Sequence, residues 1–222
     1  MLIEIKHIAK QYGKRPVLRD ITLQVNSGNC IGILGSNGSG KSTLLSILAG
    51  TTTCQKGEFL CDGTDLLKDK KLLRNYVGYV PQGTPLLEEL TVRDNLLLWY
   101  SREKLDRELK QGVLQLLGLE SMLHTQVRKL SGGMKKRLSI GCAVANHPPI
   151  LLLDEPTAAL DMACKQTVFQ YLQRYKRSGG VLFLVTHEIP DLELCDACYI
   201  LKNGVPVPFS YDGDPRKLLD SL

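Results

Sequence analysis

The segment Gly35–Thr43 limits the possible folds more than any other part of this 222-residue chain. It reads Gly-Ser-Asn-Gly-Ser-Gly-Lys-Ser-Thr and fits the pattern G-x-x-x-x-G-K-[ST] at every fixed position, Gly35, Gly40, Lys41 and Ser42. Glycines let the backbone turn with its N–H groups pointing inward, and the helix that follows such a loop adds further donors for an anion. The lysine of this pattern reaches the β- and γ-phosphates of a nucleotide, and the hydroxyl after it ligates Mg²⁺. The pattern therefore predicts a nucleoside triphosphate site.

The residues on either side of the loop support this interpretation. Cys30–Leu34 is a short apolar run typical of a buried strand, and Thr43–Ala49 reads as a helix that Gly50 ends. Strand, loop and helix thus occur in the order that a phosphate site requires. A flexible Gly/Ser-rich turn is the alternative, and the flanking elements disfavour it. We expect nucleotide contacts from Ser36, Asn37, Gly38, Ser39, Gly40, Lys41, Ser42 and Thr43.

Length and composition are those of one large globular domain, or of one domain that carries a subdomain. The chain is 43% hydrophobic and 23% charged, and its net charge of +5 has no long basic block, so we expect a solvated surface and no nucleic-acid partner. Residues 1–8 alternate like a strand and lack the apolar core of a signal peptide. The most apolar runs, 150–153 and 181–185, are too short to span a bilayer. Any membrane role is therefore expected to come through a partner.

The seven cysteines are scattered singly, as expected of reduced thiols. Cys195 and Cys198 have the spacing of a metal or redox pair, but no second pair or histidine cluster accompanies them in the sequence. We therefore predict no functional role for them.

Two runs of alternating polarity, residues 2–8 and 21–25, read as half-buried antiparallel strands that precede the phosphate loop. Tyr12 lies between them. Its ring either stacks on an adenine or belongs to an ordinary loop tyrosine, and the residues alone favour neither interpretation. Residues 76–80 form another predicted strand, and Gln82 follows at its carboxyl end, where ligands usually bind in open α/β sheets.

Residues 83–149 read as mostly helical, and they interrupt the alternation of strands and helices. Thr91–Asp94 resembles a capping box. The range 106–117 has apolar residues at helical spacing and predicts one helix, with Gly118 at its end. This segment is expected to be an inserted subdomain.

Near the end of that segment, Ser131 is a good N-cap, and Gly132 and Gly133 leave the first N–H groups of the following helix uncovered. This is a potential second anion site. On these residues alone, a plain capped helix is the favoured interpretation.

Ile150–Leu153 predicts a strand buried on both faces, and two acids follow it. In a chain with a phosphate loop, Asp154 fits a residue that holds Mg²⁺, and Glu155 fits a base that orients or deprotonates the attacking water. His187 follows the next buried strand, 181–185, and either contacts the γ-phosphate or has a structural role.

The last part of the chain predicts a final pair of strands and a helix. Residues 199–201 and 205–207 read as strands joined by the turn Asn203-Gly204. The tail, residues 214–222, reads as a short amphipathic helix.

Taken together, these motifs resemble the ATP-binding-cassette (ABC) ATPases, specifically the separate nucleotide-binding subunit of an ABC transporter. The resemblance covers essentially the whole chain. Gly35–Ser42 matches the Walker A loop, and Ile150–Asp154 with Glu155 matches the Walker B strand and the catalytic glutamate. Leu130–Met134 matches the family signature, which normally reads Leu-Ser-Gly-Gly-Gln and is far more specific than a phosphate loop.

Shorter motifs of the family follow in the same order. Tyr12 lies where the adenine-stacking aromatic belongs, Gln82 where the Q-loop glutamine belongs, and His187 where the switch histidine belongs. Residues 159–161 match the D-loop. Met134 replaces the usual signature glutamine, which removes one polar contact and does not suggest an inactive site.

The resemblance implies an α/β fold: a P-loop NTPase (RecA-like) core with an antiparallel β subdomain and an inserted α-helical subdomain. The core would comprise residues 1–82 and 150–222, and the helical subdomain residues 83–149. It also implies ATP and Mg²⁺ as cofactors. By this resemblance the catalytic residues are Glu155, His187 and Gln82, the metal residues are Ser42, Gln82 and Asp154, and Ser131, Gly132 and Gly133 contact ATP.

The resemblance further implies partners. Two cassettes would pair head to tail in the presence of ATP, and the signature of one would close over the ATP of the other. A separate transmembrane permease would hold the pair at the cytoplasmic face of the cell membrane. The segment around Gln82–Tyr100 would dock on it, although the apolar character of this segment fits internal packing equally well. The short tail favours export slightly, whereas the sequence leaves open the transported substrate and whether the two cassettes are identical.

Two other functions have to be weighed. A soluble ABC protein that acts on ribosomes or DNA usually has two cassettes or a long coiled-coil insertion, and this chain has neither. A regulatory protein that binds ATP without turnover is disfavoured by the presence of Glu155 and His187.

Overall fold

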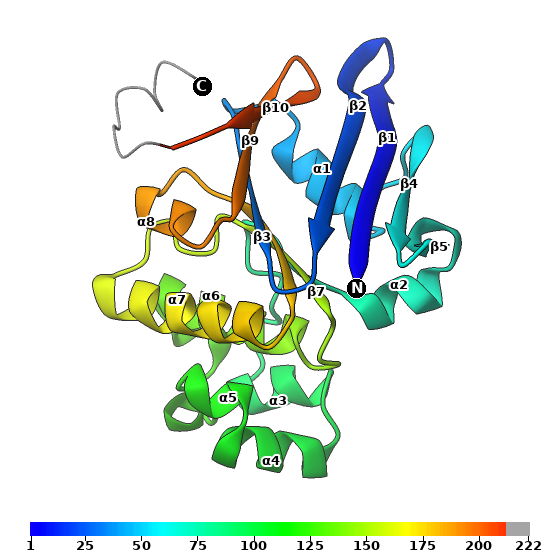
Figure 1. Cartoon of the computed structure of the whole chain (residues 1–222). Coiled ribbons are helices and arrows are strands. Elements are labelled where there is room, and N and C mark those ends of the chain that lie inside the picture. The colour runs from blue at the N-terminus through cyan, green and yellow to red at the C-terminus, as the bar shows by residue number, and fades with distance from the viewer. Residues whose placement is uncertain (212–222) are drawn as a thin grey trace.

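The strand that leads into the phosphate loop, β3 (Cys30–Leu34), lies inside a six-stranded sheet with the order β10-β9-β3-β8-β7-β6. The computed structural model describes residues 1–211, and the predicted helix over residues 214–222 lies outside this range. Figure 1 shows this sheet in the middle of the chain, with helices below it. All residues of β3, β7 and β8 are buried, as expected of strands covered on both faces. The other strands of this sheet are β6 (Val77–Val80), β7 (Ile150–Asp154), β8 (Val181–Val185), β9 (Ala197–Lys202) and β10 (Val205–Phe209).

The last two strands form the predicted hairpin. β10 pairs antiparallel with β9, whereas the other neighbours in this sheet pair in parallel. Asn203 and Gly204 both have positive φ, of 51° and 77°, which the tight turn between twisted strands requires.

A second sheet is antiparallel and has the order β2-β1-β4-β5. Its burial alternates along β1, as the sequence predicts, and Tyr12 is the last residue of β1 and not part of a loop. Apolar side chains of this sheet, of α1 (Lys41–Leu48) and of one face of the large sheet form a single core. Its strands are β1 (Leu2–Tyr12), β2 (Arg15–Asn26), β4 (Lys56–Cys61) and β5 (Thr64–Asp65).

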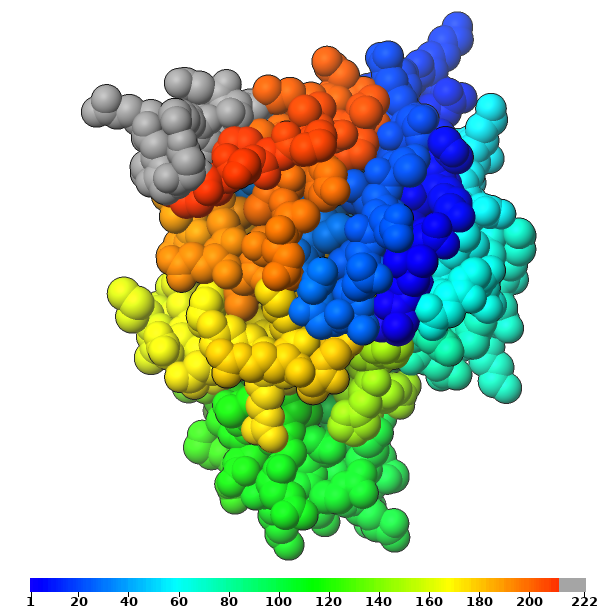
Figure 2. Space-filling model, viewed as in Figure 1, coloured from blue at the N-terminus to red at the C-terminus, as the bar shows by residue number. Residues whose placement is uncertain are grey.

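Between β6 and β7 the chain is helical and irregular, and it forms the lower lobe of the face seen in Figure 2. A second core joins these helices, the opposite face of the large sheet and α7 (Met162–Arg177). The capping box at Thr91 and Asp94 is present, with both side-chain-to-backbone hydrogen bonds. The helices of this segment are α3 (Val92–Leu97), α4 (Arg102–Gln111), α5 (Val113–Leu116) and α6 (Gly132–Ala143). The fold class expected from the sequence is confirmed.

Two short helices and three 3₁₀ turns complete the description. The helix α2 (Lys70–Tyr76) was not predicted from the sequence, and it precedes β6. The helix α8 (Ile189–Leu192) follows β8. Single 3₁₀ turns occur at Leu66–Lys68, Glu120–Met122 and Val127–Lys129.

The prediction of one helix over residues 106–117 is wrong, because the helix breaks at Gly112. The carboxylate of Glu108 accepts a hydrogen bond from the N–H of Val113 (2.9 Å) and thereby caps the start of α5. Its other oxygen lies 3.4 Å from Nε2 of His147. A Cβ at Gly112 would collide with Glu108, so this arrangement depends on glycine.

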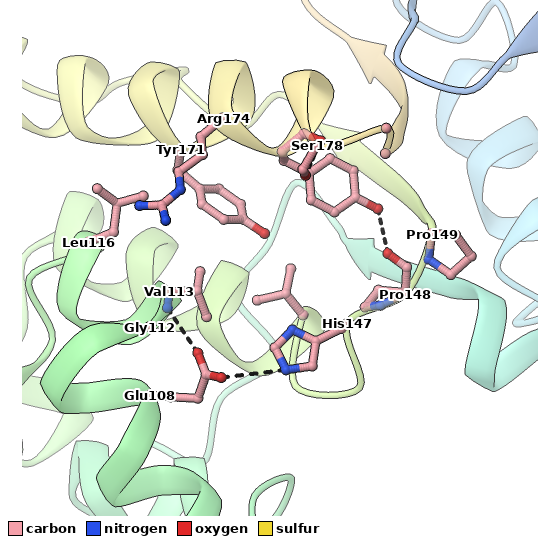
Figure 3. Close-up of a pocket in the computed structure, with 14 residues that line it drawn as sticks. Glu108, Gly112, Val113, Leu116, His147, Pro148, Pro149, Tyr171, Arg174 and Ser178 are labelled. Carbon is pink, nitrogen blue, oxygen red and sulfur yellow. Dashed lines mark hydrogen bonds and ion pairs between the residues drawn. The ribbon is translucent and has the colours of Figure 1, made fainter.

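These residues line a cavity of about 450 Å³ between α4–α5 and α7, which Figure 3 shows. Tyr171 and Tyr175 of α7 form the opposite wall, and the hydroxyl of Tyr175 donates to the carbonyl of Pro148 (2.6 Å). The residues predicted to bind nucleotide do not line this cavity.

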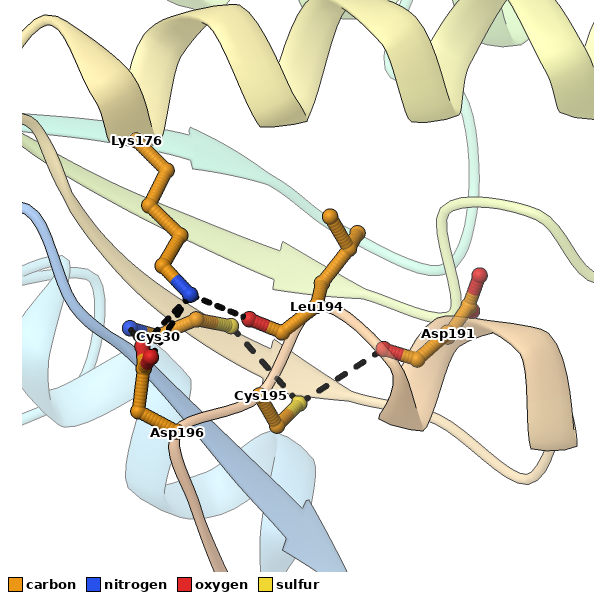
Figure 4. A network of polar contacts seen from close by, with 6 residues as sticks. All are labelled: Cys30, Lys176, Asp191, Leu194, Cys195 and Asp196. Atoms are coloured by element: carbon orange, nitrogen blue, oxygen red, sulfur yellow. Dashed lines mark hydrogen bonds and ion pairs between the residues drawn. The ribbon is translucent and has the colours of Figure 1, made fainter.

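The cysteines are free thiols. Cys30, the first residue of β3, lies close to Cys195, as Figure 4 shows. Sγ of Cys30 lies 3.7 Å from Sγ of Cys195, and a Cβ at Gly32 would lie 2.9 Å from the sulfurs of both Cys195 and Cys198. The hydrogen bond with Cys195, together with burial, raises the pKa of Cys198. Cys195 and Cys198 thus pack against a glycine that leaves room for their sulfurs. Within residues 1–211 no group of three or more histidine, cysteine or acidic residues has the geometry of a metal site.

Among residues 1–211, no helix is both long enough and apolar enough to cross a membrane.

Candidate nucleotide site

The loop between β3 and α1 has the backbone conformation that its glycines permit. Gly35, Gly38 and Gly40 have φ values of 145°, 79° and 108°. A Cβ at Gly35 would lie 2.7 Å from Oγ of Ser39, so the loop closes tightly on itself. Gly40 is the N-cap of α1 and offers no side chain to it, which leaves the first N–H groups of the helix free to bind an anion.

Lys41 begins α1 and places its ammonium inside this loop. Nζ donates to the carbonyls of Gly35 (2.6 Å) and Ser36 (3.1 Å), and only 6% of the residue is exposed. Burial lowers the pKa of Lys41, and the negative fields of Glu155 and Asp154 oppose that effect. A phosphate that entered the loop would thus meet a desolvated ammonium next to a row of backbone donors.

Asp154 ends β7 and Glu155 follows it, so both predicted acids lie at the carboxyl end of this strand, where their charges act on Lys41. Burial raises the pKa of Asp154, while a hydrogen bond with Ser42 and the charges of Lys136 and Lys41 act in the opposite direction. The Ser42 hydroxyl and the Asp154 carboxylate offer oxygen ligands of the kind that suits Mg²⁺, which takes few protein ligands and completes its shell with water and phosphate. The residues present therefore fit this metal.

Glu155 is turned toward two other predicted residues. Nε2 of Gln82 donates to one carboxylate oxygen of Glu155 (3.0 Å), and Nε2 of His187 lies 3.7 Å from the other. Glu155 has a φ of 49°, a left-handed conformation that is uncommon for a residue with a side chain, and its N–H donates to the carbonyl of Val185 (2.9 Å). The turn after β7 thus directs this carboxylate across the ends of β6 and β8.

A cleft of about 410 Å³ is lined by most of the phosphate loop, by Gln82 and by Glu155. Tyr12 lies at its edge with 53% of its surface exposed, and Nζ of Lys10 is 5.0 Å from the centre of its ring. Arg15 also lines the cleft, although sequence reasoning missed it because one arginine after a turn carries no pattern. Tyr12, Asn37, Gly38, Gly40, Lys41, Ser42, Thr43, Gln82 and Glu155 are the predicted residues in its lining. The loop residues Ser36 and Ser39 line a neighbouring cleft, and His187 and Asp154 line neither of the two.

The second predicted anion site lies elsewhere on the chain. Oγ of Ser131 accepts a hydrogen bond from the N–H of Met134 (3.3 Å), so Ser131 is the N-cap of α6. Ser131 and Gly132 are exposed, and they do not line the nucleotide cleft. A Cβ at Gly133 would lie 2.6 Å from Sγ of Cys164, so Gly133 lets α6 approach α7 closely. Within one chain, the structure does not bring these three residues to the phosphate loop.

A phosphate loop that joins a buried strand to a helix, with a carboxylate pair at the end of a parallel strand in the same sheet, defines a P-loop nucleoside triphosphatase. The chain matches the profile of the ABC transporter family over residues 18–158. It therefore belongs to that family, as its motifs predict.

Curated relatives agree with this assignment. The chain is 34% identical to the Nod factor export ATP-binding protein I of Rhizobium etli, with 99% of this chain and 70% of that protein covered. It is 35% identical to the protein of the same name from Rhizobium meliloti, and there it spans 66% of the relative's length.

Solved structures agree as well. The ATP-binding subunit of an ABC transporter is 29% identical and superposes with a TM-score of 0.85 over the whole chain and 97% of that subunit. A dimeric ATP-binding cassette in a post-hydrolysis state with ADP and Pi is 28% identical and superposes with a TM-score of 0.83. The match covers 96% of this chain and 100% of that one. The chain is thus an ATP-binding ABC ATPase, and an action on ribosomes or DNA is not favoured.

Proposed function

We propose that this chain supplies the energy for an ABC exporter by hydrolysing ATP at the cytoplasmic face of a membrane, where a separate membrane-spanning partner holds it. The proposal rests on the contact of Glu155 with both Gln82 and His187 beside the phosphate loop. This contact joins a base to two groups that can position the base and the phosphate for hydrolysis. The names of the curated relatives support export.

Each residue of the cleft has a role in this proposal. The loop amides and Lys41 bind the β- and γ-phosphates, Tyr12 stacks on the adenine, and Glu155 takes the proton of the attacking water at a carboxylate oxygen. Gln82 orients Glu155, and His187 contacts the γ-phosphate. Ser42, Asp154 and Gln82 would hold Mg²⁺, which when bound neutralises charge on the phosphates.

We also propose the head-to-tail dimer. Ser131 and Gly132 offer an exposed N-cap and uncovered N–H groups that are remote from the chain's own cleft, so a second copy is needed to use them on ATP. The test is light scattering after size-exclusion chromatography of the Glu155→Gln chain with ATP. A dimer is expected, and Ser131→Arg in the same background should return it to a monomer. A monomer in the first sample would contradict the proposal.

A groove of about 730 Å³ is the proposed docking surface for the membrane partner. It lies between the core and the helical segment, which we propose is a subdomain of residues 83–149 inserted between 1–82 and 150–222. Most of its lining is apolar, and Leu87, Leu98 and Trp99 keep 53%, 59% and 59% of their surface exposed. Apolar side chains that remain exposed around a groove are typical of a protein interface.

The experiment is to tag the chain, solubilise membranes gently and identify the proteins that co-purify. A polytopic membrane protein is expected, and Trp99→Ser should remove it while ATP hydrolysis by the purified chain remains. Val207→Ser is the matched control, because Val207 is also an exposed apolar residue (45%) but lies on β10, outside the groove. Recovery of ribosomes or soluble proteins alone, with none of the chain in the membrane fraction, would contradict the proposed function.

A further inference from the structure

A buried lysine links the helix that carries the signature motif to the loop that carries Gln82. Lys136 lies on α6, two residues after the signature residue Met134, and only 5% of it is exposed. Its ammonium donates to the backbone carbonyls of Pro81 (3.1 Å) and Gln82 (3.0 Å). These two residues directly follow β6, so the lysine fixes the backbone at the point where the chain leaves the large sheet.

The other side of Gln82 faces the proposed base. While the carbonyl of Gln82 accepts from Lys136, its side-chain amide donates to Glu155 (3.0 Å). One residue therefore joins the end of β6 both to α6 and to the turn after β7. Because a buried ammonium needs partners for its protons, Lys136 cannot leave these carbonyls without a large cost in desolvation.

Burial and two nearby acids determine the electrostatic environment of the Lys136 ammonium. Burial lowers the pKa of Lys136, whereas the negative fields of Asp154 and Glu155 raise it. The ammonium is therefore close enough to both acids to offset part of their mutual repulsion. The same two acids also act on Lys41 of the phosphate loop, whose pKa their negative fields raise.

We propose that Lys136 is a positioning residue for ATP hydrolysis: it holds the backbone of Gln82 so that the Gln82 amide stays on Glu155, and it ties this contact to the helix that begins with Ser131. A movement of α6 then moves Gln82, and the contact with Glu155 depends on where α6 lies. The inference rests on the proposed roles of Gln82 and Glu155.

The test compares turnover and ATP affinity in a set of variants of the full chain. Lys136→Met keeps the length and apolar stem of the side chain and removes its donors. If Lys136 positions Gln82, kcat falls about tenfold to a hundredfold, the range for a catalytic group displaced by up to an ångström, while the dissociation constant for ATP changes less than about twofold. Lys136→Arg keeps the charge and the donors, and it should restore kcat to within about threefold of the original chain.

The matched control is Lys104→Met. Nζ of Lys104 also donates to a backbone carbonyl, that of Ala145, but this contact lies beyond the far end of α6 and away from the nucleotide cleft. This variant should keep its kcat. An equal loss of kcat in both methionine variants would mean that any lysine-to-carbonyl contact of this segment acts through stability, and it would overturn the inference.

A double variant separates positioning from a general effect on the structure. If Lys136 acts through Gln82, Gln82→Ala combined with Lys136→Met should have the kcat of Gln82→Ala alone, whereas independent effects would multiply. Multiplied losses would overturn the inference, and so would full turnover of Lys136→Met when Gln82→Ala is slow. Full turnover of Gln82→Ala would instead remove Gln82 from the proposed site, which is a distinct failure.

A second substitution tests the inference if the Lys136→Met chain does not fold. If circular dichroism shows that Lys136→Met does not fold, Lys136→Gln replaces it in the same cycle, because this shorter, uncharged side chain keeps N–H donors but does not reach the two carbonyls as the ammonium does. It should lie between the original chain and Gln82→Ala in kcat. A value equal to that of the original chain would overturn the inference.

Discussion

Asp191 offers the sharpest test of how the structure holds the catalytic groups in place. One of its carboxylate oxygens accepts hydrogen bonds from the hydroxyls of Thr157 (2.6 Å) and Thr186 (2.7 Å). Thr157 lies two residues after Glu155, and Thr186 directly precedes His187. All three polar residues of this contact are buried, with 2%, 3% and 0% of their surface exposed. The contact thus ties together the two turns that carry the proposed catalytic residues.

The size of the effect follows from the groups that would lose partners. Asp191→Ala leaves two buried hydroxyls without their acceptor, and each unsatisfied group costs about 1–3 kcal/mol. Removal of a buried carboxylate returns part of this cost, because burial, more than any other factor, raises the pKa of Asp191 and so disfavours its charged form. We expect a net loss of about 2–4 kcal/mol in the free energy of unfolding.

The assay is urea denaturation followed by circular dichroism, with Asp191→Asn as the control. The asparagine carbonyl can accept from both hydroxyls without a buried charge, so this variant should stay within about 1 kcal/mol of the original chain. An Asp191→Ala chain as stable as the original would refute the reasoning. So would equal destabilisation by both substitutions, because the hydrogen bonds would then not be the cause.

Three further predictions follow from the same structure. The pKa of Asp191 is raised in the folded state, so folding disfavours the ionised carboxylate. The original chain should therefore lose stability relative to Asp191→Asn as the pH rises from about 4, the pKa in the unfolded state, through the pKa in the folded state. A constant difference in urea midpoint between about pH 4 and 7 would contradict this prediction. Gly112→Ala should cost about 1–3 kcal/mol in urea denaturation, since the new Cβ would collide with Glu108, whereas Gly83→Ala, at a site with open space, should cost little, and equal costs would contradict it. Lys41→Met should weaken ATP binding at least about tenfold in equilibrium titration, because a buried charge-assisted contact is worth about 1.5–3 kcal/mol, and unchanged affinity would remove Lys41 from the phosphate site.

The conformation of the phosphate loop can be predicted from the sequence because its signals are local. The loop glycines lie between an apolar run and a helix that are their neighbours in the chain. The conformation of each of these segments follows from its own residues. The hairpin at Asn203-Gly204 and the N-cap at Ser131 are also local, and the structure contains both.

Features that depend on particular side-chain contacts, most of them between residues distant in the chain, could not be predicted. The helix over residues 106–117 breaks because the side chain of Glu108 caps the next helix, and the periodicity of apolar residues does not report this. Lys136 reads as a surface lysine within a Lys-Lys-Arg run, and only its carbonyl partners, more than fifty residues earlier in the chain, explain its burial. The meeting of Cys30 with Cys195 likewise requires the pairing of β3 with β9.

Turnover of the Glu155→Gln chain is the measurement that tests the central claim most directly. Phosphate release from Mg-ATP is measured for the original chain and for the variant, together with ATP binding at equilibrium. Glutamine keeps the size of the side chain but cannot take the proton of the attacking water, so hydrolysis should nearly vanish while ATP still binds. Substantial remaining turnover would remove Glu155 from the role of base and would contradict the account of the site.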